Sequence, residues 1–231
     1  MGDEKYIIQT ICTGNICRSR MAQGILKDLV EKAGLEELME VKSSGLKVDK
    51  IRKWGAGGYM PVDSILRVLD AAYRNAVLES QYMPLAEGAL ADRELTKERH
   101  DTDDSFKDRL NDIASRAFKM ISQLDMASTM LVMAEHDLVY PVGEPVQFRE
   151  DGSSLYVPME KKLVEGIKGQ VPNPQSVRCF DEFTPGMEMK SSLVAINYNN
   201  GKLDIIDFRK IYEQVEFGCR NLMQVVEKEL K

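Results

Sequence analysis

The chain has 231 residues, of which 43% are hydrophobic and 29% charged, and its 31 Lys and Arg against 37 Asp and Glu give a formal charge of −6. This length can bury a sizeable core and fits one enlarged domain, or one domain with a small appendage. Disordered and fibrous proteins are excluded. The charges are of mixed sign without a basic block, and no stretch approaches the roughly 18 apolar residues of a membrane span. We therefore expect neither nucleic acid nor membrane as a partner.

The N-terminal sequence and the cysteine content bear on the location of the protein. Residues 1–10 begin acidic and lack the basic and apolar regions of a secretory signal, and Tyr6 stands where a myristoylation site needs Ser or Thr. The 4 cysteines, at positions 12, 17, 179 and 219, are too sparse for a disulfide framework. We expect a cytoplasmic protein.

Hydrophobic periodicity in the first part of the chain predicts strand, tight loop, helix and strand. A β-branched and apolar strand over residues 6–11 leads into the loop. Apolar side chains then recur at helical spacing from Ala22 to Ala33. Residues 39–44 are predicted to form a second short strand that ends in Ser-Ser-Gly.

The alternation continues further along the chain. Apolar stripes predict helices over residues 65–76 and 106–124, and the run TMLVMA predicts a buried strand over 129–134. This order favours an α/β fold with a short, mostly parallel, doubly wound sheet that helices cover on both faces, in three layers. An Asn-Asn-Gly turn within residues 193–206 predicts a β-hairpin, and a final amphipathic helix follows over 208–230.

The loop after the first strand has Cys12 and Arg18 at its two ends. The backbone N–H groups of residues 13–18 can curl around one tetrahedral oxyanion, and they add to the positive end of the following helix. The same field favours a thiolate at Cys12, and Arg18 offers a planar fork for two phosphate oxygens. Together they predict phosphoryl transfer through a cysteinyl-phosphate intermediate. For Cys12 alone, a buried structural cysteine is the alternative.

The string CTGNICRS over residues 12–19 resembles the active-site loop of the low-molecular-weight protein tyrosine phosphatases, whose pattern is Cys-x-Gly-Asn-Ile-Cys-Arg-Ser. The similarity extends to Met21-Ala22, Ser43-Ser44-Gly45, residues 93–96 and 130–134, and the terminal helix with Gly218-Cys219. The resemblance implies a flavodoxin-like fold of the phosphotyrosine phosphatase I type. It also implies a cysteine-dependent phosphatase that hydrolyses protein phosphotyrosine or a small aryl phosphate, without metal or cofactor.

The same resemblance assigns roles in the loop. Cys12 is expected to be the nucleophile, and Arg18 to bind phosphate and stabilise the transition state. Ser19 is expected to donate a hydrogen bond to the Cys12 sulfur, a role compatible with capping the helix. The residues expected to surround phosphate or another oxyanion are Thr13, Gly14, Asn15, Ile16, Cys17 and Arg18.

Three further residues are compared with the family in the same way. Asn15 is expected to support the loop by bonding toward Ser43. Cys17 resembles a second loop cysteine that can form a disulfide with the nucleophile, with small-residue packing as the alternative. Arg20 replaces the Pro that the family usually has at the start of the helix, and this change should leave the helix start intact.

The general acid of the family is missing from its usual position. The family takes it from an Asp-Pro before the last helix, whereas this chain has Asn173 followed by Pro, and an amide cannot donate a proton as a carboxylic acid does. Asp181 is the first candidate for a replacement, with a solvated loop acid as the alternative. Glu182, Asp204 and Asp207 lie in the same region.

The slot for the substrate ring also departs from the family. Gln175 and Ser176 stand where the family has aromatic residues after the Asp-Pro. Trp54 and Tyr59 could supply a wall that stacks on the ring, and a packing anchor is the alternative for Trp54. Ile16 resembles the apolar residue of the tyrosine-directed members.

No metal site is expected. His100 and His136 lie far apart in the sequence and lack the spacing of metal ligands. Asp101, Asp103 and Asp104 precede a predicted helix, where capping and a solvated surface explain them better than a calcium site.

Two other functions stay open. Arsenate reduction on the same loop needs a relay of resolving cysteines, and only Cys179 and Cys219 are left for it. A phospho-ligand-binding module with weak or no turnover would be consistent with Asn173 in place of the acid.

The excess length over the regions of resemblance falls mainly in three insertions, near residues 46–91, 139–170 and 175–204. These insertions adjoin segments that border the active site in the family. We therefore expect a single phosphatase-like domain over residues 1–231, in which the insertions determine the specificity.

Overall fold

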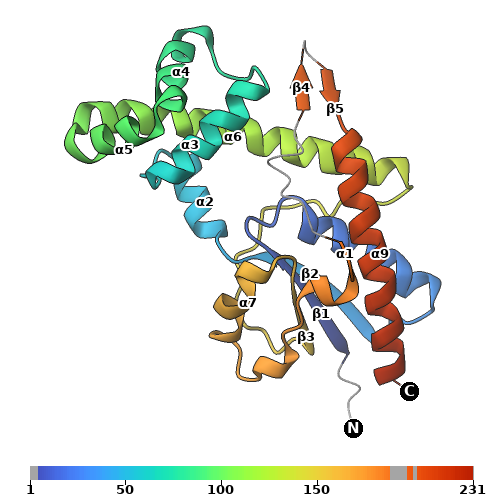
Figure 1. Cartoon of the computed structure of the whole chain (residues 1–231). Helices are drawn as coiled ribbons and strands as arrows, with labels where there is room; N and C mark the ends of the chain where they lie inside the picture. The colour runs from blue at the N-terminus through green and yellow to red at the C-terminus, as the bar shows by residue number, and fades with distance from the viewer. Residues whose placement is uncertain (1–4, 188–196, 200–201, 231) are drawn as a thin grey trace. The chain divides into compact units, whose positions relative to one another are not determined.

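A computed structural model describes residues 5–187, 197–199 and 202–230 of the chain (Figure 1). The chain divides into two compact units. The first unit comprises Met1–Val48, Thr129–Ser192 and Ile206–Lys231, and the second comprises Asp49–Ser128 and Leu193–Ile205. The prediction of a single domain with three insertions stays a prediction.

The first unit is built on a parallel sheet in the order β2-β1-β3. The central strand β1 (Tyr6–Cys12) pairs with β2 (Met39–Gly45) on one side and with β3 (Leu155–Pro158) on the other. Cys12 lies opposite Gly45, and its neighbour Ile11 lies opposite Pro158. Since all three strands run the same way, the loop that starts at Cys12 emerges at the carboxyl edge of the sheet, where the ligand sites of such folds lie.

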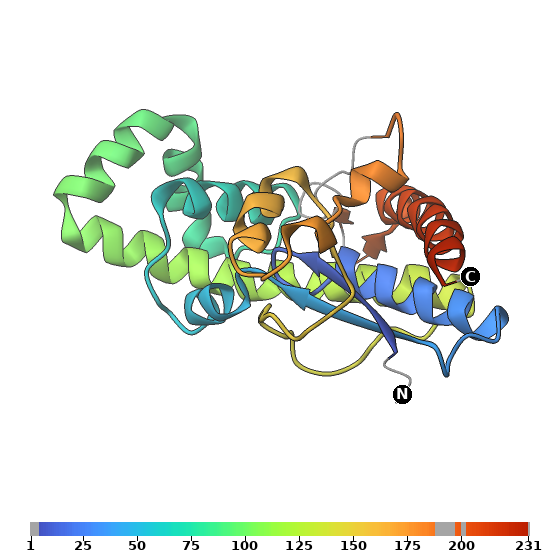
Figure 2. The same cartoon turned by 90° about the horizontal axis from the view of Figure 1, so that it is seen from below.

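Helices cover both faces of this sheet. Thr10 donates a hydrogen bond to the Ser19 carbonyl of α1 (Arg18–Lys32), which places α1 on the Thr10 face, and α1 packs side by side with α9 (Ile206–Glu229) (Figures 1 and 2). Ile11 points to the opposite face, because side chains alternate along a strand, and packs there with Ile167 of α7 (Lys161–Lys168). The predicted three-layer, doubly wound α/β fold is confirmed.

The predicted strand over residues 129–134 is wrong. These residues are the last turns of the long helix α6 (Asp104–Glu135). Val132 and Met133 are fully buried, whereas Met130 and Leu131 are 42% and 48% exposed, so only one side of the run is covered. A short apolar run fits a buried strand and a buried helix equally well, and here no breaker separates it from the helix before it.

The third strand of the sheet lies later in the chain than predicted. β3 falls within residues 139–170, a range that the sequence suggests to be an insertion, and all four of its residues are buried. Its sequence, LYVP, is short and ends in Pro, so it gives a weak strand signal. The short 3-10 helices η2 (Pro174–Ser176) and η3 (Phe180–Phe183) follow α7 in this unit.

The second unit is mainly helical. It contains most of α6, and the other helices are α2 (Val48–Gly55), α3 (Val62–Arg74), α4 (Met83–Ala91), α5 (Arg93–Thr102) and the short 3-10 helix η1 (Ser80–Tyr82). Its core is formed where α3, α4 and α6 bury side chains such as Ile65, Leu69, Ala86 and Leu110. The strands β4 (Asn197–Asn199) and β5 (Lys202–Asp204) pair antiparallel, which confirms the predicted hairpin where the structure describes it.

None of the helices within the described ranges combines the length and the apolar composition that a bilayer-spanning segment needs. The predicted cytoplasmic location stays a prediction.

Candidate active site

The loop between β1 and α1 bends sharply through Asn15, whose φ of 53° lies in the left-handed region that asparagine tolerates better than most residues. The loop lies close against the end of β2. A Cβ atom at Gly45 would stand 2.7 Å from the Asn15 nitrogen and 2.8 Å from the Gly14 carbonyl carbon, so only glycine fits there. Gly45 thus permits the close approach that closes the loop.

The sulfur of Cys12 receives two hydrogen bonds at the floor of this loop. The Asn15 backbone N–H and the Ser19 hydroxyl each donate to Sγ over 3.1 Å, and the Cys12 residue is 5% exposed. α1 begins at Arg18, so Ser19 lies within the helix rather than at its cap. Two donors and the positive end of a helix stabilise a sulfur that carries negative charge.

The side chain of Asn15 links the loop to its surroundings. Its Nδ2 donates to the Ser19 hydroxyl over 3.1 Å and to the Ser43 hydroxyl over 2.9 Å, so the contact that the resemblance implies is present. Its Oδ1 accepts from the Val146 N–H over 2.9 Å. Ser43 in turn donates to Gln23 Oε1 over 2.7 Å. The strained residue of the loop is therefore held from α1, from β2 and from the segment before β3.

Arg18 projects a buried guanidinium at the other end of the loop. One terminal nitrogen, Nη2, donates to a carboxylate oxygen of Glu160, which follows β3. The other, Nη1, is buried and has no hydrogen-bond partner among the described residues. Arg18 is only 6% exposed, so an unpaired donor there has a large desolvation cost unless an acceptor meets it.

Glu160 is a site residue that the sequence did not predict. Burial disfavours both charges of the pair, but each side chain stabilises the other: Glu160 raises the pKa of the Arg18 guanidinium, and Arg18 and Lys162 lower the pKa of the Glu160 carboxyl. Lys162 also pairs with the second oxygen of Glu160. The useful signal, a carboxylate two residues after the end of a parallel strand, could not be seen because β3 itself was missed.

The residues considered for the general acid bond to partners other than Arg18 and Glu160. Asn173 is exposed, and its side-chain oxygen caps its own turn by accepting from the Gln175 N–H over 3.1 Å. Asp181 pairs with Lys161 at 3.4 Å. Glu182 caps η3 by accepting from the Cys179 N–H over 2.8 Å.

The proposed ring slot belongs to the second unit. Trp54 lies at the end of α2 and meets Phe118 edge to face with 6.3 Å between ring centroids, which is the contact of a packing anchor. Tyr59 is 63% exposed and its hydroxyl bonds to Asp108. A slot role for either residue stays a prediction.

Each of the two histidines, which were considered as metal ligands, contacts another side chain. His100 is nearly buried beside Asp101, and His136 stacks on Tyr212 with 3.8 Å between ring centroids. Among the residues that the structure describes, no group of three or more His, Cys, Asp or Glu side chains is placed to hold a metal ion. Cys12 and Cys17 are both buried and are not joined by a disulfide in this structure, so a disulfide between them stays a prediction.

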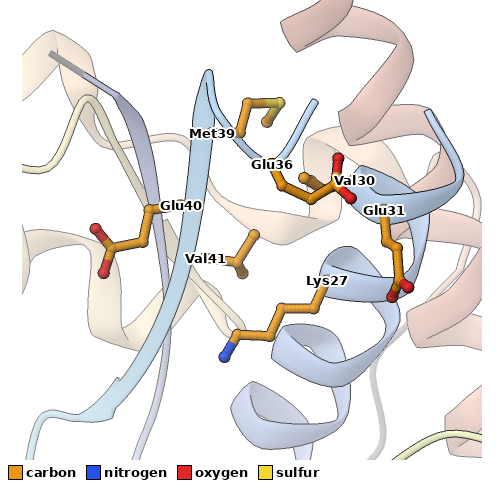
Figure 3. Close-up of a pocket in the computed structure, with 7 residues that line it drawn as sticks. All are labelled: Lys27, Val30, Glu31, Glu36, Met39, Glu40 and Val41. Atoms are coloured by element: carbon orange, nitrogen blue, oxygen red, sulfur yellow. The ribbon is translucent and has the colours of Figure 1, made fainter. Parts of the chain in front are cut away.

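A surface pocket of about 280 Å³ lies at the opposite end of β2 from Cys12, between the end of α1 and the start of the strand (Figure 3). Cys12, Arg18 and Glu160 do not line this pocket. Its lining residues are Lys27, Val30, Glu31, Glu36, Met39, Glu40 and Val41.

The fold and the loop define a class: a parallel α/β protein with a thiol and an arginine at the two ends of a strand-to-helix loop at the carboxyl edge of the sheet. Residues 7–56 match the sequence model of the family described as low molecular weight phosphotyrosine protein phosphatase. Over these residues the chain is similar to that family, and the resemblance found in the sequence is confirmed for this part of the chain.

Individual relatives align with a short part of the chain. The chain is 36% identical over 66 residues to low molecular weight phosphotyrosine protein phosphatase 2 of Drosophila melanogaster, covering 29% of this chain and 37% of that protein. It is 50% identical over 40 residues to a low molecular weight protein-tyrosine-phosphatase of Streptomyces coelicolor, covering 17% and 24%. The aligned region thus spans about a third or less of these relatives.

Solved structures share the fold over the whole chain at low identity. YfkJ from Bacillus subtilis aligns with 100% of both chains at a TM-score of 0.55 and 14% identity. A protein tyrosine phosphatase from Entamoeba histolytica covers 97% of this chain and 99% of its own at a TM-score of 0.53 and 12% identity. Vibrio vulnificus Wzb, in complex with benzylphosphonate, covers 96% and 99% at 0.52 and 13%.

Proposed function

We propose that this protein is a cysteine-dependent phosphatase that hydrolyses protein phosphotyrosine or a similar aryl phosphate. The observation that carries the proposal is the Cys12 sulfur, which accepts two hydrogen bonds within the loop. The loop ends at the buried guanidinium of Arg18, whose Nη1 has no hydrogen-bond partner among the described residues. A phosphoryl group supplies three oxygens for the loop N–H groups of residues 13–18 and for Nη1.

The reaction proceeds in two displacements. Cys12 Sγ attacks phosphorus, the S–P bond forms, and the P–O bond to the leaving group breaks while that oxygen takes a proton. Water then attacks phosphorus and gives up a proton, the P–S bond breaks, and phosphate leaves with the thiolate restored. Ser19 stabilises the departing thiolate through its 3.1 Å hydrogen bond. Arg18 and the loop amides stabilise the charge that spreads over the phosphoryl oxygens.

The source of the leaving-group proton distinguishes this protein from the family. Asn173 has no acidic proton, Asp181 is paired with Lys161, and Glu160 is held ionised by two cations. We expect good leaving groups to depart without help and poor ones to be hydrolysed slowly. A phospho-ligand-binding module with little turnover is the second candidate, favoured by Asn173.

Arsenate reduction is not favoured by the cysteines outside the loop. Burial raises the pKa of the Cys179 thiol, and burial within α9 raises that of Cys219 still further. Both changes disfavour the thiolates that a resolving relay needs.

Trapping the intermediate tests the proposed function. Rapid acid quench during turnover of p-nitrophenyl phosphate, followed by mass spectrometry, should find one phosphoryl group on the peptide that contains Cys12. A protein that binds inorganic phosphate but neither turns over this substrate nor becomes phosphorylated would instead support the binding module.

The Glu160→Gln variant should bind inorganic phosphate more tightly than the wild type, by about tenfold or more. Two unit charges about 5 Å apart in such a site interact by about 3 kcal/mol, so the carboxylate repels a bound anion. The hydrogen bond from Arg18, worth about 1–3 kcal/mol, can be retained because the glutamine oxygen still accepts it. Isothermal titration calorimetry measures the affinity.

Glu165→Gln is the matched control for this prediction. It removes the same charge from an exposed position on α7, where Glu165 pairs only loosely with Lys168 at 3.7 Å. Its phosphate affinity should equal that of the wild type. Weaker binding in Glu160→Gln would mean that positioning of Arg18 outweighs charge competition.

A further inference from the structure

Residues 139–148 lie against the proposed anion-binding loop, residues 12–18. The Tyr140 hydroxyl donates to the Ile16 carbonyl over 2.7 Å. The Val146 N–H donates to Asn15 Oδ1 over 2.9 Å, and its carbonyl accepts from the Gly45 N–H over 2.8 Å. The Phe148 N–H donates to the Gly45 carbonyl over 2.8 Å. The segment therefore bonds both to the loop and to the end of β2 that the loop approaches.

Tyr140 is itself held in place by α1. Its residue is 6% exposed, and the guanidinium carbon of Arg20 lies 5.4 Å from the centroid of its ring. Arg20 is 4% exposed and donates from Nη1 to the Pro141 carbonyl over 2.7 Å. Two independent contacts, one to the ring and one to the next backbone carbonyl, thus anchor Tyr140 to the helix that starts at the loop.

The hydrogen bond from Tyr140 acts on a particular peptide group of the loop. The Ile16 carbonyl and the Cys17 N–H belong to one planar trans peptide, so they point in opposite directions. A donor that holds the carbonyl toward the outside of the loop therefore directs the Cys17 N–H toward the inside. Without that donor, this peptide can rotate. Binding an anion would then also cost the free energy of ordering the loop, so the affinity would fall.

We propose that Tyr140, anchored by Arg20, is a positioning residue that orients the Cys17 amide for binding the phosphoryl group. The inference rests on the proposed function, since it concerns the same anion-binding loop. It also gives a role to Arg20, which stands where the family usually has a proline: a proline could not make either contact. Tyr140 touches no reacting atom, and it acts only through the loop peptide.

Phosphate binding by a pair of tyrosine variants tests this inference. Tyr140→Phe deletes the hydroxyl and keeps the ring under Arg20. Tyr156→Phe is the matched control, because Tyr156 is a buried tyrosine of β3 whose hydroxyl accepts from the Ser153 N–H over 3.0 Å, away from the loop. Calorimetry with inorganic phosphate, urea unfolding, and steady-state kinetics on p-nitrophenyl phosphate are measured for both.

We expect Tyr140→Phe to weaken phosphate binding about five- to tenfold, the effect of one hydrogen bond. We expect KM to rise and kcat/KM to fall by a similar factor, whereas Tyr156→Phe keeps the phosphate affinity of the wild type. Both variants should lose comparable stability to urea. Phosphate affinity in Tyr140→Phe that equals the wild type, or an equal loss of phosphate affinity in the two variants, would overturn the inference.

The same data separate this inference from the proposed function. If the wild type binds phosphate without turnover and Tyr140→Phe binds it more weakly, the phosphatase proposal fails and the positioning role stands. If turnover is present and Tyr140→Phe binds phosphate normally, the positioning role alone fails. A wild type that does not bind phosphate overturns both.

Discussion

Replacing Cys12 by serine should lower turnover of p-nitrophenyl phosphate by at least about four orders of magnitude, while phosphate still binds. A serine hydroxyl stays protonated where a thiol ionises, so the nucleophile is lost. The Asn15 N–H bonds to the sulfur, and a serine oxygen can accept that bond in its place. The buried donor of Arg18 is independent of the sulfur, so we expect the oxyanion site to persist. Steady-state kinetics and calorimetry with inorganic phosphate measure the two effects separately.

Cys179→Ser is the matched control for this experiment. Cys179 is half-buried at the start of η3 and lies outside the loop, so the same atom exchange there should leave kcat unchanged. A Cys12→Ser protein that keeps wild-type turnover would falsify the cysteinyl-phosphate mechanism. Loss of phosphate binding together with turnover would show that the sulfur is needed to shape the loop itself.

Replacing Asn173 by aspartate should raise kcat on aryl phosphates with poor leaving groups by roughly 10²-fold and change it little for p-nitrophenyl phosphate. The aspartate can keep the cap to the Gln175 N–H, and its charge stays in solvent because position 173 is exposed. The gain should appear only below the pKa of the new carboxyl, where it carries a proton to donate. A pH profile of kcat over a series of substituted phenyl phosphates measures it.

Gln175→Glu adds the same charge two residues away and should not produce this gain. The prediction also requires that the wild type depends steeply on the leaving group. A flat dependence in the wild type, with no gain in Asn173→Asp, would mean that another acid already operates. Asp181→Asn should then make the dependence steep.

The first 45 residues could be interpreted from the sequence because their signals are local. A β-branched strand leads into a loop with Cys12 and Arg18 at its ends, and the helix and second strand follow at short range. The residues that complete the site come from far along the chain. Glu160 is 142 residues from Arg18, and Tyr140 is 124 residues from Ile16.

Two errors show why the rest could not be predicted in the same way. The run over residues 129–134 has the composition of a buried strand, but the helix before it continues because nothing breaks it. The short strand β3 has little intrinsic signal and forms because its backbone pairs with β1. In both cases the neighbours of a segment decide its structure more than its own side chains do.

The sequence by itself determined the local part of the proposed site: a thiol, an arginine and the backbone N–H groups of a loop between a strand and a helix. Only the tertiary structure decided which residues contact them. In it, Arg18 pairs with Glu160, the Tyr140 hydroxyl donates to the Ile16 carbonyl, and the Val146 N–H donates to the side chain of Asn15. The physical reason is that a nucleophile and an oxyanion loop need residues close in sequence. Their charge balance and rigidity depend on partners that only folding brings within hydrogen-bond distance.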